Sequence, residues 1–176
     1  MSNDNTMDVD EVLSAIKKTS EELFELISST NDSNFNLIPF PGSWTFAQVL
    51  SHITKSNVAM LQVLNMDGKT AQRNVSERVP ELESTFLNYS LKFQSPAFIL
   101  PGSETFEVAS LVDILKKSII KIQSAAAKTN AAGMVTLPAL GEITKYELLH
   151  FVLYHTQRHI HQLKNIIAHL HEEKIA

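Results

Sequence analysis

The sequence contains no cysteine. This absence excludes disulfide bonds, iron–sulfur clusters, thiolate zinc sites and a cysteine nucleophile. A metal ion would therefore have to be bound by histidine, carboxylate or other oxygen ligands. Seven histidines are present to supply such a site.

Long apolar runs and an excess of basic residues are also missing. No run approaches the roughly 18 apolar residues of a transmembrane helix, and the N-terminus lacks the basic and apolar segments of a signal peptide. The net charge of −4 provides no basic surface for phosphate groups or anionic lipid. We therefore expect a cytoplasmic protein that binds neither nucleic acid nor membranes.

What the sequence does contain is helical periodicity. A chain of 176 residues is long enough for one compact domain, and we expect a single domain over residues 1–176 with a disordered tail at 1–6. Apolar residues recur at helical spacing in four segments, which are 7–29, 45–65, 104–130 and 144–171. No segment is convincing as a strand. The pattern predicts an all-α protein, a four-helix bundle.

Local signals sharpen the ends of these helices. Thr45 with Gln48, and Thr144 with Glu147, have the spacing of capping boxes and should open the second and fourth helices. Gly133 is expected to end the third helix. Residues 134–143 are expected to be a connector.

The stretch from residue 66 to residue 101 has the least regular pattern. A short helix is expected near residues 81–90, followed by an apolar loop between Phe93 and Pro101. A loop of this length is long enough to cross the bundle between the second and third helices, and such loops often carry function.

Two histidines interrupt the apolar stripe of the last helix. His155 and His159 are four residues apart, so they lie one turn apart on one helix face. They are either core-edge side chains bonded to backbone or water, or two ligands of a metal. The zincin pattern H-E-x-x-H is absent. His52 is the third candidate, because it alone lies on another bundle-facing helix arc. Three neutral imidazoles would leave a coordination position open.

The other four histidines are expected to be structural. His150 and His161 share a different face of the last helix and should point away from a metal. His169 and His171 lie in the last helical turn, where a cation interacts favourably with the helix dipole.

Two pairs of short motifs, which match in order and spacing, resemble the DinB/YfiT-like metalloenzyme family over nearly the whole chain. They are Gly42-Ser-Trp-Thr45, Gln48-Val-Leu-Ser-His52, Leu140-Gly-Glu-Ile-Thr144 and His155-Thr-Gln-Arg-His-Ile-His-Gln-Leu163. The resemblance implies a four-helix bundle, frequent homodimers and a divalent metal, zinc or nickel, bound by His52, His155 and His159. It also implies an Arg before the last ligand and a Gln after it, here Arg158 and Gln162.

The function implied by this resemblance is a metal-dependent enzyme that acts on a small molecule. Relatives include transferases that activate a low-molecular-weight thiol and hydrolase-like members that would activate water. Two alternatives remain open: a non-catalytic, metal-stabilised binding or stress-response module, and a helical dimerisation protein without metal.

Several residues have a candidate role beside the metal. Trp44 is either a packing anchor or one wall of a substrate pocket with Phe93 and Phe98. Arg158 would contact an anionic substrate or, alternatively, solvent or an interface. Gln162 would orient His159, because ligating imidazoles usually donate their second N–H. Glu142 and Glu147 are better explained by the connector and the capping box than by acid–base catalysis.

Overall fold

The computed structural model describes residues 9–138 and 140–172. The tail expected at residues 1–6 lies outside this range. The elements, in chain order, are α1 (Val9–Ser29), η1 (Asp32–Asn34), α2 (Phe46–Leu64), α3 (Val79–Phe86), η2 (Ala97–Ile99), α4 (Val108–Ala126), β1 (Met134–Leu137), β2 (Gly141–Thr144) and α5 (Lys145–Glu172).

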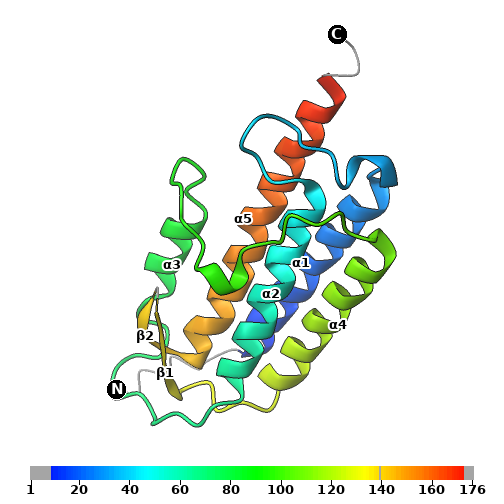
Figure 1. Cartoon of the computed structure of the whole chain (residues 1–176). Coiled ribbons are helices and arrows are strands. Elements are labelled where there is room, and N and C mark those ends of the chain that lie inside the picture. The colour runs from blue at the N-terminus through cyan, green and yellow to red at the C-terminus, as the bar shows by residue number, and fades with distance from the viewer. Residues whose placement is uncertain (1–8, 139, 173–176) are drawn as a thin grey trace.

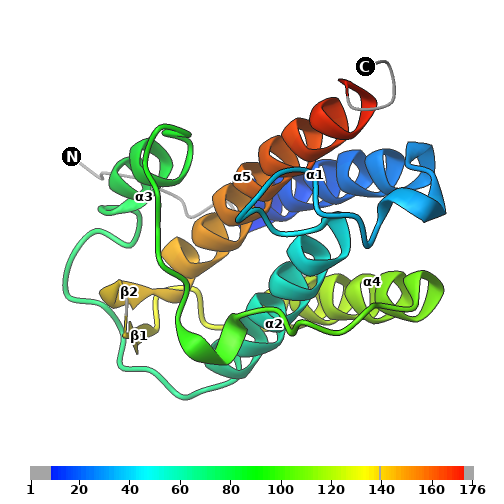
Figure 2. The ribbon, with the colours of Figure 1, turned by 45° about the horizontal axis from the view of Figure 1, so that its top comes forward.

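Four long helices, α1, α2, α4 and α5, form the predicted bundle (Figure 1). Helix α5 packs against α1 and α2, α2 also packs against α4, and α1 touches α4, which closes the ring. The short helix α3 lies outside the bundle against α5 (Figure 2). None of the helices in the described residues is both long and apolar enough to cross a membrane.

The long crossover between α2 and α4 exists because these neighbours run in the same direction (Figure 1). Near their starts, Asn36 Nδ2 donates to Phe106 O and Asn36 Oδ1 accepts from Phe106 N, each at 2.9 Å. At their ends, Thr129 Oγ1 donates to Leu64 O at 3.2 Å. Residues 65–107 therefore travel back along the bundle, and α3 and η2 form on the way.

The connector before α5 differs from the prediction. It contains a two-stranded antiparallel hairpin in which Met134 pairs with Thr144 and Leu137 with Gly141. Gly141 adopts a positive φ of 68°, which glycine tolerates without steric cost. Strands of four residues give too little alternation to be recognised in a sequence.

The third long helix, α4, is also shorter than predicted. It begins at Val108, where Glu107 caps Ala109 and Ser110, and it ends at Ala126. Gly133 therefore does not end it. This glycine instead lies beside Thr70 in an isolated bridge and close to Gly68, where a side chain would meet the Met134 backbone.

The bundle core has two apolar halves. Between them lie buried hydroxyl and amide groups from all four helices, namely Thr19, Ser20, Ser56, Asn57, Ser118 and Thr156. The hydroxyls bond mainly to carbonyls one turn earlier in their own helices, and Asn57 Nδ2 donates to Ser118 Oγ at 3.1 Å. Ser56 follows His52 by one turn, and Thr156 follows His155, so this polar layer leads directly to the histidines.

Candidate metal centre

The structure brings His52, His155 and His159 together although 103 residues separate the first two. The Nε2 atom of His155 lies 3.1 Å from Nε2 of His52 and 3.1 Å from Nε2 of His159. All three side chains are buried, with residue exposures of 2%, 7% and 7% in chain order. The three histidines named from helical spacing, from the helix arc of His52 and from the motif resemblance therefore lie together in the fold.

Regular helix geometry accounts for this convergence. His155 and His159 project from successive turns of α5. His52 projects from α2, whose start is fixed by a complete capping box in which Thr45 Oγ1 and the Gln48 side chain each bond the other residue's backbone N–H. Because α2 and α5 pack together, the register of both helices determines where the imidazoles meet.

The second nitrogen of two of these rings is already occupied. His52 Nδ1 donates to Ile99 O at 2.9 Å, and His159 Nδ1 donates to Gln162 Oε1 at 2.8 Å. A carbonyl oxygen can only accept, so each ring carries its hydrogen on Nδ1 and a lone pair on Nε2. Both lone pairs face the Nε2 atom of His155. That nitrogen carries at most one hydrogen, so it cannot donate a full hydrogen bond to both of them. The cluster therefore has more acceptors than donors, an imbalance that a cation would remove.

The protein environment keeps these imidazoles neutral. Burial lowers the pKa of His52, despite the opposing effect of the Ile99 carbonyl. Burial, followed by the proximity of His159 and His52, lowers the pKa of His155 well below its usual value. Burial likewise lowers the pKa of His159 to about 3. Neutral imidazole is the form that binds metals.

Two of the distances in the cluster fit a tetrahedral divalent ion. Zinc–nitrogen bonds of roughly 2.0–2.1 Å at tetrahedral angles place ligand nitrogens about 3.3 Å apart, close to the 3.1 Å from Nε2 of His155 to Nε2 of His52 and of His159. All three side chains offer a nitrogen within 4.8 Å of the others. No carboxylate of residues 9–138 or 140–172 joins the cluster. Three protein ligands are the usual complement of a catalytic zinc site, which keeps one position open.

Aromatic rings pack against two of the three clustered histidines. The Trp44 ring centroid lies 5.1 Å from that of His52, and Phe151 stacks on His155 at 5.2 Å. Phe86 of α3 meets the edge of His155 at 6.4 Å. Trp44 therefore packs directly against His52. This position agrees both with a packing anchor and with a residue beside the candidate metal centre.

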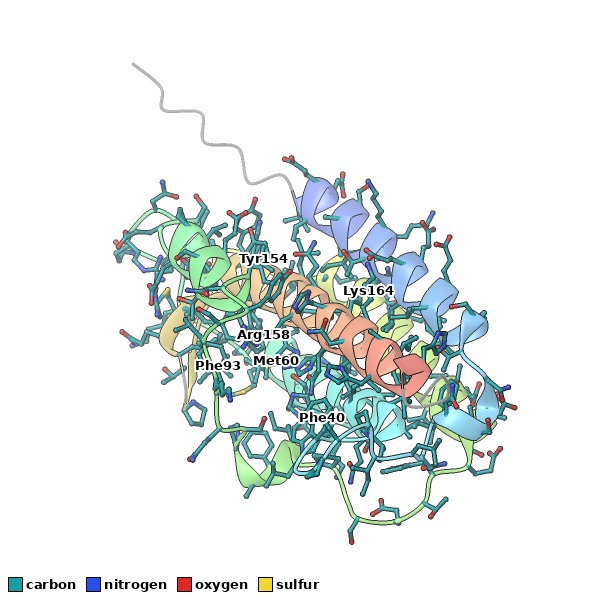
Figure 3. The ribbon with its side chains drawn as sticks, turned by 90° about the horizontal axis from the view of Figure 1, so that it is seen from above. Phe40, Met60, Phe93, Tyr154, Arg158 and Lys164 are labelled. Carbon is teal, nitrogen blue, oxygen red and sulfur yellow. The ribbon has the colours of Figure 1, made fainter. Side chains whose placement is uncertain are left out.

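The other predicted pocket residues lie further out. Phe93 stacks on Phe86 at 5.6 Å and carries the Arg158 guanidinium 4.6 Å above its ring (Figure 3). Phe98 lies in η2, next to the Ile99 carbonyl that holds His52, and its side chain is exposed. Their contact with a substrate stays a prediction.

Arg158 and Gln162 have different surroundings. Gln162 holds His159, in the way expected of a residue that orients a ligand. Arg158 donates to the carbonyls of Phe86, Asn88 and Leu91, and so fastens the loop that follows α3. A role of Arg158 toward an anionic substrate stays a prediction.

The remaining histidines on α5 stand apart from the cluster. His150 bonds the Tyr146 carbonyl at 3.1 Å, and His161 stacks on Tyr89 with ring centroids 3.9 Å apart. His169 bonds the Asn165 carbonyl near the end of the helix. None of them is among the ligands that the described residues bring together.

Two important partners escaped prediction from the sequence. The Ile99 carbonyl, which fixes the His52 ring, belongs to a loop whose path has no sequence signal. Arg73 forms a double hydrogen bond with Glu147, both contacts at 2.6 Å, and so gives this carboxylate a partner besides its capping box. Glu147 is fully buried, and its spacing from Thr144 was the only available signal.

Known proteins share this fold. The chain is similar to TT2238, a four-helix bundle protein, with a TM-score of 0.61 and 16% identity over 89% of this chain and 98% of the other. It is also similar to YfiT from Bacillus subtilis, described as a probable metal-dependent hydrolase with an unusual four-helix bundle topology, with a TM-score of 0.60 and 14% identity over 94% of this chain and 89% of the other.

Sequence comparison leads to the same family. The uncharacterized protein YuaE of Bacillus subtilis (strain 168) is 19% identical over 158 residues, which are 88% of this chain and 96% of YuaE. The family model of the DinB superfamily matches residues 15–163, a span that includes all three clustered histidines. The resemblance found in the motifs is thus confirmed, and the chain belongs to the DinB superfamily.

Proposed function

We propose that this protein is a metal-dependent enzyme whose divalent ion, zinc or nickel, is bound by His52, His155 and His159. The observation that carries the proposal is the convergence of three Nε2 atoms, two of which present lone pairs because their Nδ1 hydrogens are already donated. A cation satisfies all three at once. Imidazole ligands accept several first-row ions, and availability decides among them.

We propose hydrolysis of a small molecule as the reaction. An ion in such a site acts as a Lewis acid and lowers the pKa of a water that it coordinates. The residues of this chain would hold the ligand rings, with Ile99 O and Gln162 fixing their orientation. The rings of Trp44 and Phe151 would limit access of bulk water to the ligands. The similarity to YfiT supports this choice over others.

Thiol transfer is the alternative reaction, and the same metal would then activate a low-molecular-weight thiol. The two are separated by assaying the zinc- or nickel-loaded, untagged protein with p-nitrophenyl acetate, and with glutathione and chlorodinitrobenzene. We expect metal-dependent ester hydrolysis. Thiol conjugation without ester hydrolysis would identify transfer, and not hydrolysis, as the reaction. The absence of both activities in metal-loaded protein would favour a non-catalytic binding module.

His155→Ala and His161→Ala provide a matched pair for this assay. Both remove an imidazole from α5, but only His155 belongs to the cluster. We expect His155→Ala to reduce hydrolysis to the uncatalysed background and His161→Ala to retain it. Equal activity in the two variants would contradict a catalytic role for the cluster.

A further inference from the structure

A group of exposed apolar side chains lies on the two loops that also contact His52, through the Ile99 carbonyl and the Trp44 ring. We call it the apolar rim and define it as Leu37, Ile38, Phe40, Phe93, Phe98 and Leu100. The exposed fractions reach 65% for Ile38 and 62% for Phe98, and Phe93 is 49% exposed. All six come from two loops, one before α2 and one between α3 and α4. Apolar side chains that gather in this way mark binding surfaces.

The rim is held in place by the rest of the protein. The Asn36 side chain joins the two loops through the backbone of Phe106. Gln48 Nε2 donates to Gly102 O at 3.0 Å, and Lys55 Nζ donates to Leu100 O at 2.7 Å, so α2 fastens the second loop. The backbone of both loops is therefore fixed by hydrogen bonds while these apolar side chains stay exposed to solvent.

The rim is continuous with the candidate metal centre. The residue between Phe98 and Leu100 is Ile99, whose carbonyl bonds His52 directly. The loop that carries Leu37, Ile38 and Phe40 leads into Trp44, which packs on His52. On the other side, Phe93 lies under Arg158, on the α5 turn between the other two ligands (Figure 3). Both loops of the rim therefore contact the cluster or its helix directly.

The charged groups nearby do not favour a highly charged ligand. The guanidinium of Arg158 donates to three backbone carbonyls, and Lys55 donates to a fourth. Both cations thus serve the loops that form the rim. A ligand would therefore find one metal-binding position at the histidines and mainly apolar side chains on the apolar rim.

We propose that the substrate of the metal centre carries an alkyl or aryl chain beside the group that binds the metal, and that this chain lies on the apolar rim. This inference rests on the proposed function, because it needs a metal at the three histidines. A second copy of the chain is the competing occupant of the rim, since the family resemblance implies homodimers. Continuity with the metal ligands favours the small molecule.

Hydroxamates test this inference because they join a metal-binding head to an alkyl chain of chosen length. Calorimetry would compare acetohydroxamate with butano-, hexano- and octanohydroxamate on the full-length, zinc-loaded protein. Each methylene fully removed from water contributes roughly fourfold in affinity. With partial burial on an open rim, we expect octanohydroxamate to bind at least about tenfold more tightly than acetohydroxamate.

Phe98→Ala should weaken this dependence on chain length, measured as the ratio of octanohydroxamate affinity to acetohydroxamate affinity within the same variant. The matched control is Ile114→Ala, which removes an exposed apolar side chain from α4, outside both loops. Because Phe98 and Ile114 are both exposed, neither substitution should impair folding. Light scattering on the same samples would show whether Phe98→Ala alters the oligomeric state.

Each contrary outcome is distinguishable. Affinities that do not depend on chain length, in protein that binds both zinc and acetohydroxamate, would overturn the inference and leave the metal proposal standing. A change of mass in Phe98→Ala with an unaltered hydroxamate series would assign the rim to a dimer interface and also overturn it. Failure to bind zinc at all would refute the proposed function itself.

Discussion

Helix α5 contains two buried polar clusters that are built in opposite ways. In its first turn, Glu147 accepts hydrogen bonds from Arg73, from Arg78 N at 2.8 Å and from Thr144 N at 2.8 Å. Lys145, also buried, donates to the carbonyls of Leu64 and Met66 at the end of α2. In the middle of the helix, His155 and His159 instead meet His52 of α2, and the Nε2 atom of His155 faces those of the other two.

The difference between the two clusters lies in where their complementary groups come from. Every charge of the first cluster meets an opposite charge or dipole supplied by the chain, so that cluster is complete as folded. The histidine cluster gathers acceptors around one point, which an added cation would complete. The first cluster therefore supports the fold, where α3, the hairpin and α5 meet, and we propose that the second is a metal site.

Among substitutions in the two clusters, we expect the largest effect from Glu147→Ala, and we expect it on the free energy of unfolding. Glu147→Ala leaves the Arg73 guanidinium and the N–H groups of Thr144 and Arg78 without their acceptor. Breaking a buried ion pair in this way costs about 3–5 kcal/mol, measured as the free energy of unfolding in urea. Glu81→Ala is the control, because Glu81 pairs with Arg78 at the surface and such pairs contribute at most about 1 kcal/mol.

Metal binding should not depend on the stability that Glu147 contributes. We expect Glu147→Ala to bind metal with the same stoichiometry as the unaltered protein at temperatures where it remains folded. Loss of the metal from folded Glu147→Ala protein would show that the two clusters are not independent.

A smaller effect is expected at Gln162, which completes the orientation of His159. Gln162→Leu removes the acceptor of the Nδ1 hydrogen, and loss of such a partner weakens metal affinity by roughly 10- to 100-fold. Gln162→Glu keeps an acceptor and should restore most of the affinity. Competition with a chromophoric chelator measures the change.

Gln157→Leu is the matched control for Gln162. Gln157 lies on the same helix, and its side chain reaches Thr19 at 3.5 Å rather than a ligand. Equal metal affinity in Gln162→Leu and Gln157→Leu would contradict the orienting role of Gln162.

How much of this arrangement the sequence predicts depends on the range of each interaction. Helical periodicity and two capping boxes specify four helices, and a regular helix then determines which side chains share a face, so His155, His159 and His52 could be named together. Motif resemblance strengthened that choice. These features need only local geometry and one packing relation between α2 and α5.

The contacts that escaped prediction depend on the paths of loops. Ile99 reaches His52 across 47 residues, and Arg73 reaches Glu147 across 74. Neither follows from periodicity, because loop residues have no repeating geometry. The hairpin was missed for a related reason: each of its strands is stabilised by pairing with the other and not by any local signal.

The smallest expected effect concerns pH. Burial alone would raise the pKa of Glu147, but the hydrogen bonds from Arg73, Thr144 and Arg78 outweigh it, and the pKa of this carboxyl lies below its usual value near 4.5. A carboxyl with a lowered pKa stabilises the folded state above its unfolded pKa, and that stabilisation is lost as the pH falls through the folded pKa.

Glu147→Gln isolates this contribution. It retains one acceptor oxygen but replaces the other by an NH2 group that faces N–H donors, and it removes the charge, so we expect a deficit of roughly 1–3 kcal/mol near neutral pH. The deficit should stay constant from neutral pH to about pH 5 and shrink below the usual carboxyl pKa. Urea titrations at a series of pH values measure it, and a deficit that grew on acidification would contradict the assignment.

The central claim is that the histidine cluster is a metal site and the Glu147 cluster is not. The direct test is elemental analysis of untagged protein grown in metal-replete medium, for the unaltered chain, His155→Ala and His161→Ala. The account predicts about one equivalent of zinc or nickel in the unaltered chain and in His161→Ala, and less than about a tenth of that in His155→Ala. Metal-free unaltered protein, or equal metal in all three, would contradict it.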